Sequence, residues 1–393
     1  MSASPGASLR TLVLLALAGF VSGASMRVSD PLLPTLATEF GARVRDAAWV
    51  LTAFTAAYGV FQIIHGSLGD RFGKLRMIAI GLVLAAVAAA GCAFAASLPA
   101  LVLFRFLTGM TAGAVIPLSL AFIGDKVDYA GRQALLGRFI AGTLLGQSFG
   151  PLIGGVLSDT VGWRATFLLL GVAFLATGGL LAREARLLDD RGGGRLAPPW
   201  QRYATMLRSA RARPVLTTVG IEGFLFFGAF GFVGTYLKQR FGLSDTVAGL
   251  AVAGFGVGGL SYSLVVGRLV RRLGETGLVR GGGVTLLICF AVLAVAPSAW
   301  LAAPSVVAMG FGFYMLHNTL QVRATEMAPE ARGAAVSFFA FSLFLGQAVG
   351  VFAYGWVGEH AGYAPGFAFT GAALLLLAQQ FRARLIGLAQ PTA

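Results

Sequence analysis

Long apolar stretches alternate with short polar segments along nearly the whole chain. Twelve of them reach the length of about 20 residues that an α-helix needs to cross roughly 30 Å of hydrocarbon. Strands of a membrane barrel span in about 10 residues and alternate polar with apolar positions, which these stretches do not. The pattern predicts an all-α membrane protein whose twelve spans lie at 11–37, 48–66, 77–96, 99–122, 135–157, 163–183, 214–237, 247–267, 278–296, 301–321, 333–357 and 364–381.

The composition excludes the other broad classes of protein. Of the 393 residues, 57% are hydrophobic and only 12% are charged, whereas a soluble domain carries about 25% charged residues. This excludes a soluble enzyme, a disordered chain and a fibrous one. The first stretch also has features of a signal peptide, with Arg10 ahead of an apolar core and small residues at 22–25. It continues at helix length to Leu36, so we expect it to be a span.

The positive charges predict the orientation of the chain. With the N-terminus inside, the cytoplasmic segments hold 23 of the 30 lysines and arginines and the outer segments hold 5. Because positive charges concentrate in cytoplasmic loops, both termini are expected in the cytoplasm. The net charge of +14 is therefore explained without nucleic acid, which we do not expect as a partner. Neither the two cysteines nor the three histidines show metal-ligand spacing, so we expect no metal and no cofactor.

An internal repeat divides the chain into two halves of six spans. Residues 66–74 align with 267–275 at an offset of 201, and residues 144–150 align with 344–350 at an offset of 200. The longest connection is Gly- and Arg-rich and lacks the GxxxxGK[ST] pattern of a phosphate loop. The expected domains are a six-helix bundle at 1–183, a cytoplasmic linker at 184–213 and a second six-helix bundle at 214–393. Parallel repeats of this kind suggest a cavity between two rocking bundles.

Two motifs stand out, one charged and one rich in glycine. The loop after the second span reads GSLGDRFGKLR. Its carboxylate and basic groups, together with an acidic residue after the fourth span, predict a charged gate. The alternative is an ordinary cytoplasmic loop that carries positive charges. The gate residues are Gly66, Asp70, Arg71, Gly73, Lys74 and Asp125.

The fifth span leaves much of one helix surface without side chains, which permits close helix packing or a local bend. Its motif consists of Gly137, Gly146, Gly150, Pro151, Gly154 and Gly155.

These motifs resemble the major facilitator superfamily. The loop is similar to its GxxxDRxGRK signature, and RFLTGMTAG (Arg105–Gly113) resembles its RxxxG motif. The fifth span resembles the G(x8)G(x3)GP(x2)GG pattern of the antiporter branch, and Pro31–Pro34 resembles an element of twelve-span drug:proton antiporters, although Ala24-Ser25 stands where Leu-Gly usually precedes it. The resemblance implies twelve transmembrane helices in two pseudo-symmetric bundles and a role of Arg105 in proton transfer.

Four ionisable residues lie within the spans and are functional candidates, because burying a charge costs at least about 2.5–3.5 kcal/mol. They are Arg27, Asp30, Arg105 and Glu222. Glu222 lies roughly 13 Å into its span, among glycines and phenylalanines, a setting suited to a carboxyl that takes up protons. A structural ion pair with an arginine is the alternative. Arg27 and Asp30 lie on one helix face, where they either pair locally or exchange partners during a transport cycle.

Other polar residues within the spans are candidates for a cavity lining. They either line the cavity or bridge helices, and the sequence does not distinguish these roles. They are Gln147, Gln347, His317, Asn318 and Gln321.

The sequence thus predicts a secondary transporter rather than an enzyme, since no nucleophile–base pair appears. We expect proton-coupled efflux of a small amphipathic compound by a monomer in the inner membrane, surrounded by lipid and driven by the proton gradient. The gate is expected to close the cytoplasmic side in the outward-facing state and to open in the other. The alternatives are an exporter or proton symporter of a sugar, amino acid or organic anion, and a non-transporting membrane receptor.

Overall fold

The computed structural model describes residues 8–126, 129–188, 212–327 and 332–389, and within these ranges it contains helices and no strand. The helices before the expected linker are α1 (Leu9–Arg27), α2 (Leu33–Glu39), α3 (Val44–Ala47), α4 (Trp49–Phe72), α5 (Lys74–Ala93), α6 (Leu98–Ala112), α7 (Val115–Lys126), α8 (Tyr129–Thr160) and α9 (Trp163–Leu187). We call them the N-terminal helices.

The C-terminal helices follow it. They are α11 (Ala212–Glu222), the π-helical turn η1 (Gly223–Phe227), α12 (Gly228–Phe230), α13 (Val233–Phe241), α14 (Asp245–Val295), α15 (Ala299–Glu326), α16 (Arg332–His360) and α17 (Tyr363–Ala389). Most of the expected linker, at 189–211, lies outside the described residues.

Eleven of the described helical segments are long and apolar enough to cross a membrane. One of them, α14, has 51 residues and contains a non-helical break at Gly274, where φ is 63° and ψ is 178°. Only glycine adopts this conformation readily. The break lies between the expected spans 247–267 and 278–296, so α14 accounts for two spans and the all-α prediction with twelve spans is confirmed.

Several spans are interrupted. The first consists of α1 and α2, which are separated at residues 28–32 next to Pro31 and Pro34. The fourth is divided into α6 and α7 at Gly113-Ala114, and the seventh contains η1. A break in a helix at membrane depth leaves backbone N–H and C=O groups without their helical hydrogen bonds, and other parts of the protein must supply partners. These interruptions therefore mark positions of interest for transport.

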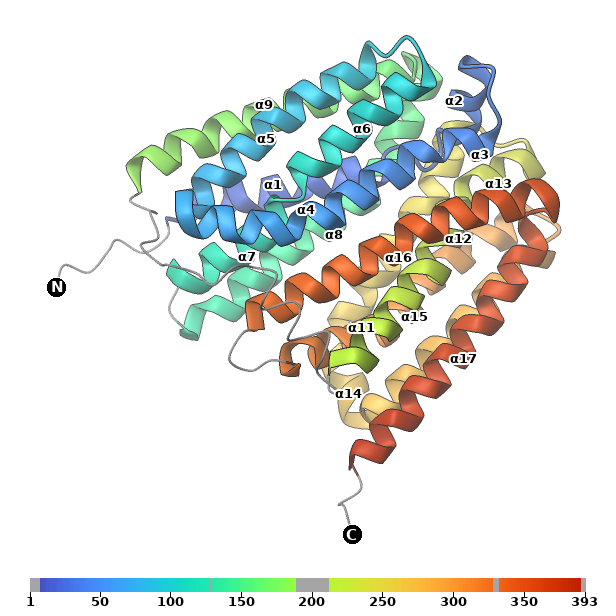
Figure 1. Cartoon of the computed structure of the whole chain (residues 1–393). Coiled ribbons are helices and arrows are strands. Elements are labelled where there is room, and N and C mark those ends of the chain that lie inside the picture. The colour runs from blue at the N-terminus through green and yellow to red at the C-terminus, as the bar shows by residue number, and fades with distance from the viewer. Residues whose placement is uncertain (1–7, 127–128, 189–211, 328–331, 390–393) are drawn as a thin grey trace.

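The helices form two groups that lie side by side, α1–α9 and α11–α17 (Figure 1). Both ends of the described chain, the end of α9 and the start of α11 lie at one end of the molecule, which we call the linker end. The loops that follow α2, α5, α8, α13 and α16 lie at the opposite end. Which end faces the cytoplasm stays a prediction.

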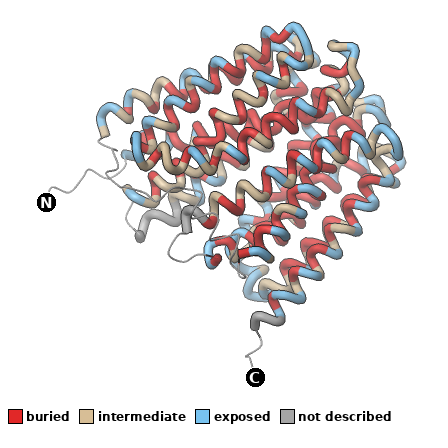
Figure 2. The backbone as a smooth tube through the Cα atoms, viewed as in Figure 1, coloured by how far each residue is buried: buried red, intermediate tan, exposed pale blue. Residues whose placement is uncertain are grey.

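Buried residues line the faces along which the helices meet, and exposed residues lie on the outer faces (Figure 2). The outer faces are themselves apolar. Val87 of α5 is 67% exposed and Leu264 of α14 is 84% exposed. A soluble protein rarely exposes apolar area on this scale, whereas hydrocarbon chains of a bilayer cover it without cost.

The sequence repeat corresponds to a repeat of backbone contacts. A Cβ atom at Gly146 would lie 2.0 Å from the carbonyl oxygen of Phe20, and a Cβ at Gly346 would lie 2.0 Å from that of Gly220. Each pair is related to the other by an offset of 200 residues. The contact between α8 and α1 thus recurs between α16 and α11. The domain boundaries themselves stay a prediction.

The two groups of helices contact each other mainly through α8 with α14 and α4 with α16. The polar contacts between the groups gather at the opposite end, where Arg43 and Arg45 each pair with Glu359 at 2.6 Å. At the linker end, the described ion pairs join helices of the same group. The described residues therefore form a state that is closed at the opposite end.

Candidate functional site

Glu222 and His317 form a buried pair within the C-terminal helices. Glu222 is the last residue of α11 and is fully buried, and its Oε2 lies 2.7 Å from Nδ1 of His317 on α15. The second carboxylate oxygen, Oε1, has no hydrogen-bond partner among the described residues. The sequence predicts both residues as candidates but does not predict that they meet.

Aromatic rings surround this pair. The ring of Phe313 stacks on His317 with centroids 4.8 Å apart, and Phe339 lies 5.4 Å away. Phe226 of η1 contacts Phe313 at 4.4 Å. The pair therefore lies inside an apolar shell, where a change of charge has a large electrostatic effect.

The local backbone explains how Glu222 reaches this position. The turn that follows it is the π-helical turn η1, a form that recurs at functional sites in membrane and soluble helices. Gly223 allows α16 to approach closely, since a Cβ there would lie 2.3 Å from the carbonyl oxygen of Leu343. The extra residue of the π turn and the close contact together fix the direction of the Glu222 side chain.

Arg27 and Asp30 form the local ion pair that the sequence allows. Nη1 of Arg27 lies 3.2 Å from Oδ2 of Asp30, and both side chains are buried. The guanidinium also lies 4.4 Å from the ring centroid of Phe227 and 5.1 Å from that of Phe230. Because these rings belong to the C-terminal helices, Arg27 is a contact between the two groups as well as a partner of Asp30.

Arg105 bonds to backbone rather than to a carboxylate. It is fully buried and donates to the carbonyl oxygen of Ser25 at 3.0 Å, to the Ser25 hydroxyl at 3.4 Å and to the carbonyl oxygen of Val50 at 3.4 Å. Its guanidinium lies over the ring of Phe54 at 4.1 Å. Arg105 therefore ties the last turn of α1, next to Arg27, to α4.

The charged gate is an arrangement within the N-terminal helices. Lys74 pairs with Asp70 at 3.3 Å and with Asp125 at 2.7 Å. Gly73 ends α4 and begins α5 with a φ of 95°, and Gly66 faces open space. Arg71 lies over the ring of Phe72.

Both ion pairs of Lys74 are present while the opposite end is closed. All three charged groups lie on helices of one group, so separating the groups does not separate the charges. Opening and closing of this gate with the cytoplasmic side stays a prediction. The C-terminal helices hold a counterpart of reversed charge, Arg323 with Glu275 at 2.5 Å.

The glycine motif of α8 faces three different surroundings. A Cβ at Gly137 would meet nothing within 4 Å. At Gly146, Gly150 and Gly154 it would lie 2.0–2.5 Å from carbonyl oxygens of the first span. Gly155 instead faces the other group, 2.1 Å from the carbonyl oxygen of Asp245, and the carbonyl of Pro151 faces Gly249. Close packing explains most of the motif, and its last glycine lies on the contact between the groups.

The remaining polar candidates are dispersed. Asn318 donates to the Tyr262 hydroxyl at 3.4 Å and so bridges α15 and α14, and Gln321 is exposed. Gln147 and Gln347 occupy equivalent places, with their backbone nitrogens close to Gly23 and Gly223. Gln347 is buried, and its Oε1 has no partner among the described residues. Of these residues only His317 joins the Glu222 site.

Sequence reasoning missed a polar network at the opposite end. The carboxylate of Asp159 accepts from the backbone N–H groups of Asp245 and Thr246, at 3.2 and 2.7 Å, and so caps α14. Asp245 in turn accepts from the hydroxyls of Thr35 and Ser158 at 2.7 Å each and pairs with Lys238. The tripeptide Ser-Asp-Thr occurs at both 158–160 and 244–246, and this repetition was the available indication.

Comparisons with known proteins agree with the fold. A family model described as "Major Facilitator Superfamily" matches residues 15–351. The chain is 28% identical over 355 residues to the "Uncharacterized MFS-type transporter YwfA" of Bacillus subtilis, covering 88% of this chain and 84% of that protein. It is 24% identical over 332 residues to the multidrug export protein EmrB of Escherichia coli, covering 71% of this chain and 65% of EmrB.

Two solved structures share the fold at low sequence identity. A mutant of the peptide transporter POT superposes with a TM-score of 0.79 at 16% identity, covering 97% of this chain and 96% of that one. A bacterial homologue of the human lysosomal transporter Spinster, in an inward-facing and unoccupied conformation, superposes with a TM-score of 0.74 at 17% identity, covering 95% of each chain.

Proposed function

The chain belongs to the Major Facilitator Superfamily of membrane transporters, and from that premise we propose that it exports a small amphipathic compound in exchange for protons. In this proposal it is a monomeric, multi-pass protein of the inner membrane and has no enzymatic activity. The linker end faces the cytoplasm, so the state described above is open inward.

The observation that carries the proposal is the buried Glu222–His317 pair. The carboxyl and the imidazole lie 2.7 Å apart in a buried site, and in this proposal a proton taken up by the pair changes the charge of that site. Such a change alters the stability of each transport state by several kcal/mol, because isolated buried charges are costly. This is the property that coupling to a proton gradient requires.

Arg27 supplies a connection between proton binding and the movement of the two groups. Its guanidinium lies on Phe227 and Phe230, five and eight residues after Glu222 on the same span. Opening the opposite end separates these partners and leaves Arg27 with Asp30 alone. In the proposed cycle, protonation from outside and substrate binding from inside shift the equilibrium between making and breaking the contact of Arg27 with these rings in opposite directions.

Aromatic side chains support an amphipathic substrate. Phe226, Phe227, Phe230, Phe255 and Phe313 form one cluster of rings with centroids 4.4–6.5 Å apart, beside the ionisable groups. A site of this composition suits a flat apolar body that carries one polar group. The similarity to the multidrug export protein EmrB supports export of such compounds.

One observation favours a second candidate, export of an organic anion. Nη2 of Arg27 is buried and has no hydrogen-bond partner among the described residues, and a carboxylate or sulfonate group would satisfy it. A sugar site would need a tryptophan in the cavity. The candidate for that role within a span, Trp356, is 53% exposed and stacks on His360 near the end of α16, so a sugar substrate receives no such support.

The test uses inverted membrane vesicles with an acidified lumen and a pH-sensitive quenched dye. We expect an amphipathic compound to restore the fluorescence in wild type and to fail in Glu222→Gln. Glu184→Gln is the matched control. Glu184 is also buried, but it belongs to the N-terminal helices and pairs there with Arg10. Loss in both variants, or release of protons by no compound in a panel of amphipaths, organic anions and sugars, would contradict the proposal.

A further inference from the structure

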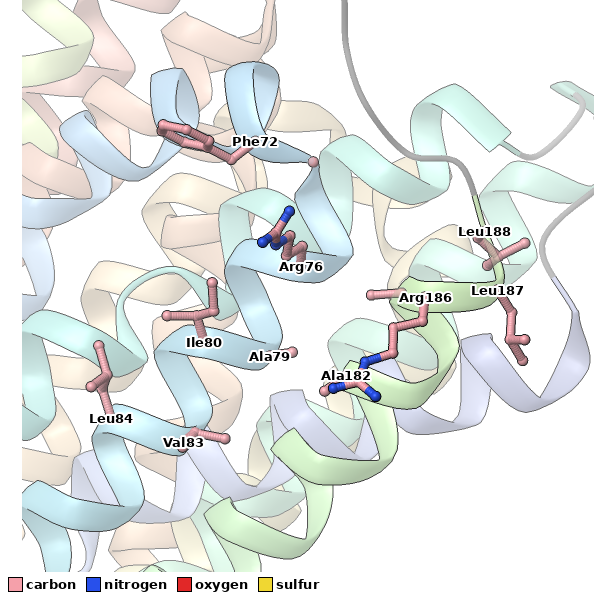
Figure 3. Close-up of a pocket in the computed structure, with 12 residues that line it drawn as sticks. Phe72, Arg76, Ala79, Ile80, Val83, Leu84, Ala182, Arg186, Leu187 and Leu188 are labelled. Carbon is pink, nitrogen blue, oxygen red and sulfur yellow. The ribbon is translucent and has the colours of Figure 1, made fainter.

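A large surface cavity lies outside the proposed transport site, between α5 and α9 at the linker end (Figure 3). Its volume is about 890 Å³. Two arginines stand in it, Arg76 on the first turn of α5 and Arg186 at the end of α9. The rest of the lining is mainly apolar and includes Phe72, Ile80, Val83, Leu84, Ala182 and Leu187.

The two arginines are free to bind a ligand. Within the described part of the chain, neither forms an ion pair. The carboxylates nearest in sequence are already engaged, since Glu184 pairs with Arg10 and Asp70 pairs with Lys74. Both residues are exposed. Figure 3 shows the Arg186 side chain running back along α9 towards Ala182, so that its charge lies within the cavity.

The depth of the charged and apolar parts matches that of a phospholipid. Arg76 and Arg186 lie at the very ends of membrane-length helices, where headgroups are found. Leu84 lies eight residues further along α5, about 12 Å deeper at 1.5 Å per residue. Ile80 is 43% exposed and Leu84 is 50% exposed. A ligand with an anionic head and an apolar tail would satisfy both parts at once.

The fold does not itself require these charges. At the repeat offset of 201, the counterpart of Arg76 is Gly277, and at the offset of 200 the counterpart of Arg186 is Ile386. The equivalent places in the C-terminal helices thus lack both arginines. The charges are specific to one of the two repeated surfaces.

We propose that the cavity between α5 and α9 binds an anionic phospholipid of the surrounding membrane, with its phosphate held by Arg76 and Arg186. The acyl chain lies along Ile80, Val83 and Leu84. The backbone N–H groups at the start of α5 also favour an anion, because a helix N-terminus carries partial positive charge. The first turn of α5 holds no acidic residue, and its N-cap makes no side-chain hydrogen bond. The site is independent of the Glu222–His317 pair.

The test is native mass spectrometry of the purified full chain in a non-ionic detergent. Phosphatidylglycerol and phosphatidylcholine with the same acyl chains are titrated separately, and glycerol 3-phosphate is the soluble headgroup alone. Each arginine near an anionic surface contributes about 1 kcal/mol, so Arg76→Gln/Arg186→Gln should weaken phosphatidylglycerol binding about 30-fold. Phosphatidylcholine binding should not change.

Two further variants keep the result decisive. Arg271→Gln/Arg272→Gln removes two exposed arginines from α14 and should leave phosphatidylglycerol binding at its wild-type value. Arg76→Lys/Arg186→Lys should retain most of it and serves if the glutamine pair does not fold. Equal losses in the two glutamine pairs, equal binding of both lipids, or equal binding of glycerol 3-phosphate would each overturn the proposal.

Discussion

Glu222 and His317 lie 95 residues apart and depend on each other for their burial. Removing the histidine leaves a buried carboxyl without a partner, which costs roughly 1–3 kcal/mol or more. We therefore expect His317→Leu to lower the melting temperature of the purified protein. Glu222→Gln/His317→Leu should melt at a higher temperature than His317→Leu, because the uncompensated charge is gone. A double variant that melts at or below the single one would show that the pair is not coupled.

Arg105 makes three hydrogen bonds in different directions, which a guanidinium can satisfy and an ammonium cannot. We expect Arg105→Lys to fold but to transport at least about tenfold more slowly, since one or more lost hydrogen bonds of about 1.5 kcal/mol each loosen the junction of α1 and α4. The measurement is the initial rate of proton release in inverted vesicles. Arg271→Lys, on the exposed surface of α14, is the control and should keep the wild-type rate.

At this scale the sequence indicates which ionisable residues are buried better than it indicates their partners. An ionisable side chain inside an apolar stretch is conspicuous, so Arg27, Asp30, Arg105 and Glu222 are found at once. The partner of Glu222 depends on how two helices far apart in the chain are rotated towards each other. The apolar stretches carry too little periodicity to give that rotation, so His317 is predicted only as a cavity residue.

The glycines of α8 test how tightly this helix packs. A Cβ at Gly146 would lie 2.0 Å from the Phe20 carbonyl oxygen, a backbone atom that cannot move aside alone. We expect Gly146→Ala to destabilise the purified protein by about 1–3 kcal/mol, as is typical of overpacking, and so to lower its melting temperature. Gly137→Ala belongs to the same motif and meets no described neighbour, so it should melt like wild type. Similar melting of the two variants would disprove the packing contact.

Helix positions are largely predictable from the sequence, and helix interruptions only partly so. Length and hydropathy locate the spans, and Pro31 and Pro34 indicate the break between α1 and α2. The π-helical turn after Glu222 has no comparable indication, because its register is set by the approach of α16 at Gly223. Such features result from packing between helices rather than from the propensity of any one segment.

At the scale of the whole molecule, Gly155 lies where the two groups of helices meet at the opposite end. A side chain there would lie 2.1 Å from the Asp245 carbonyl oxygen of the other group. We expect Gly155→Ala to hold the groups apart at that end. The measurement is the labelling rate of Ser148→Cys, a buried position of α8 that faces Gly256, by a membrane-impermeant thiol reagent. Labelling should rise several-fold.

Gly179→Ala supplies the comparison, because a Cβ there would meet nothing within 4 Å. It should leave labelling of Ser148→Cys unchanged. The native cysteines, Cys92 and Cys289, are both buried and should contribute little. Unchanged labelling in Gly155→Ala would show that this glycine does not control the contact.

The sequence predicts the halves through its repeat and proposes an orientation through its charges, but it does not reveal which end is closed. Both ends are rich in charged residues. The difference is that ion pairs between the groups, those of Arg43 and Arg45 with Glu359, occur at the opposite end, whereas the described pairs of the linker end all stay within one group. Only coordinates distinguish these two arrangements.

We expect this asymmetry of the ion pairs to bias the resting population of the transporter. Opening the linker end breaks none of the ion pairs among the described residues, while opening the opposite end breaks those of Glu359 and exposes Asp245. An unloaded protein should therefore wait with its linker end open. Shifting such an equilibrium from 1:99 to 99:1 takes about 5.5 kcal/mol. A substrate that binds both states equally well would not shift this equilibrium, however tightly it bound. It would therefore not be carried to the other side.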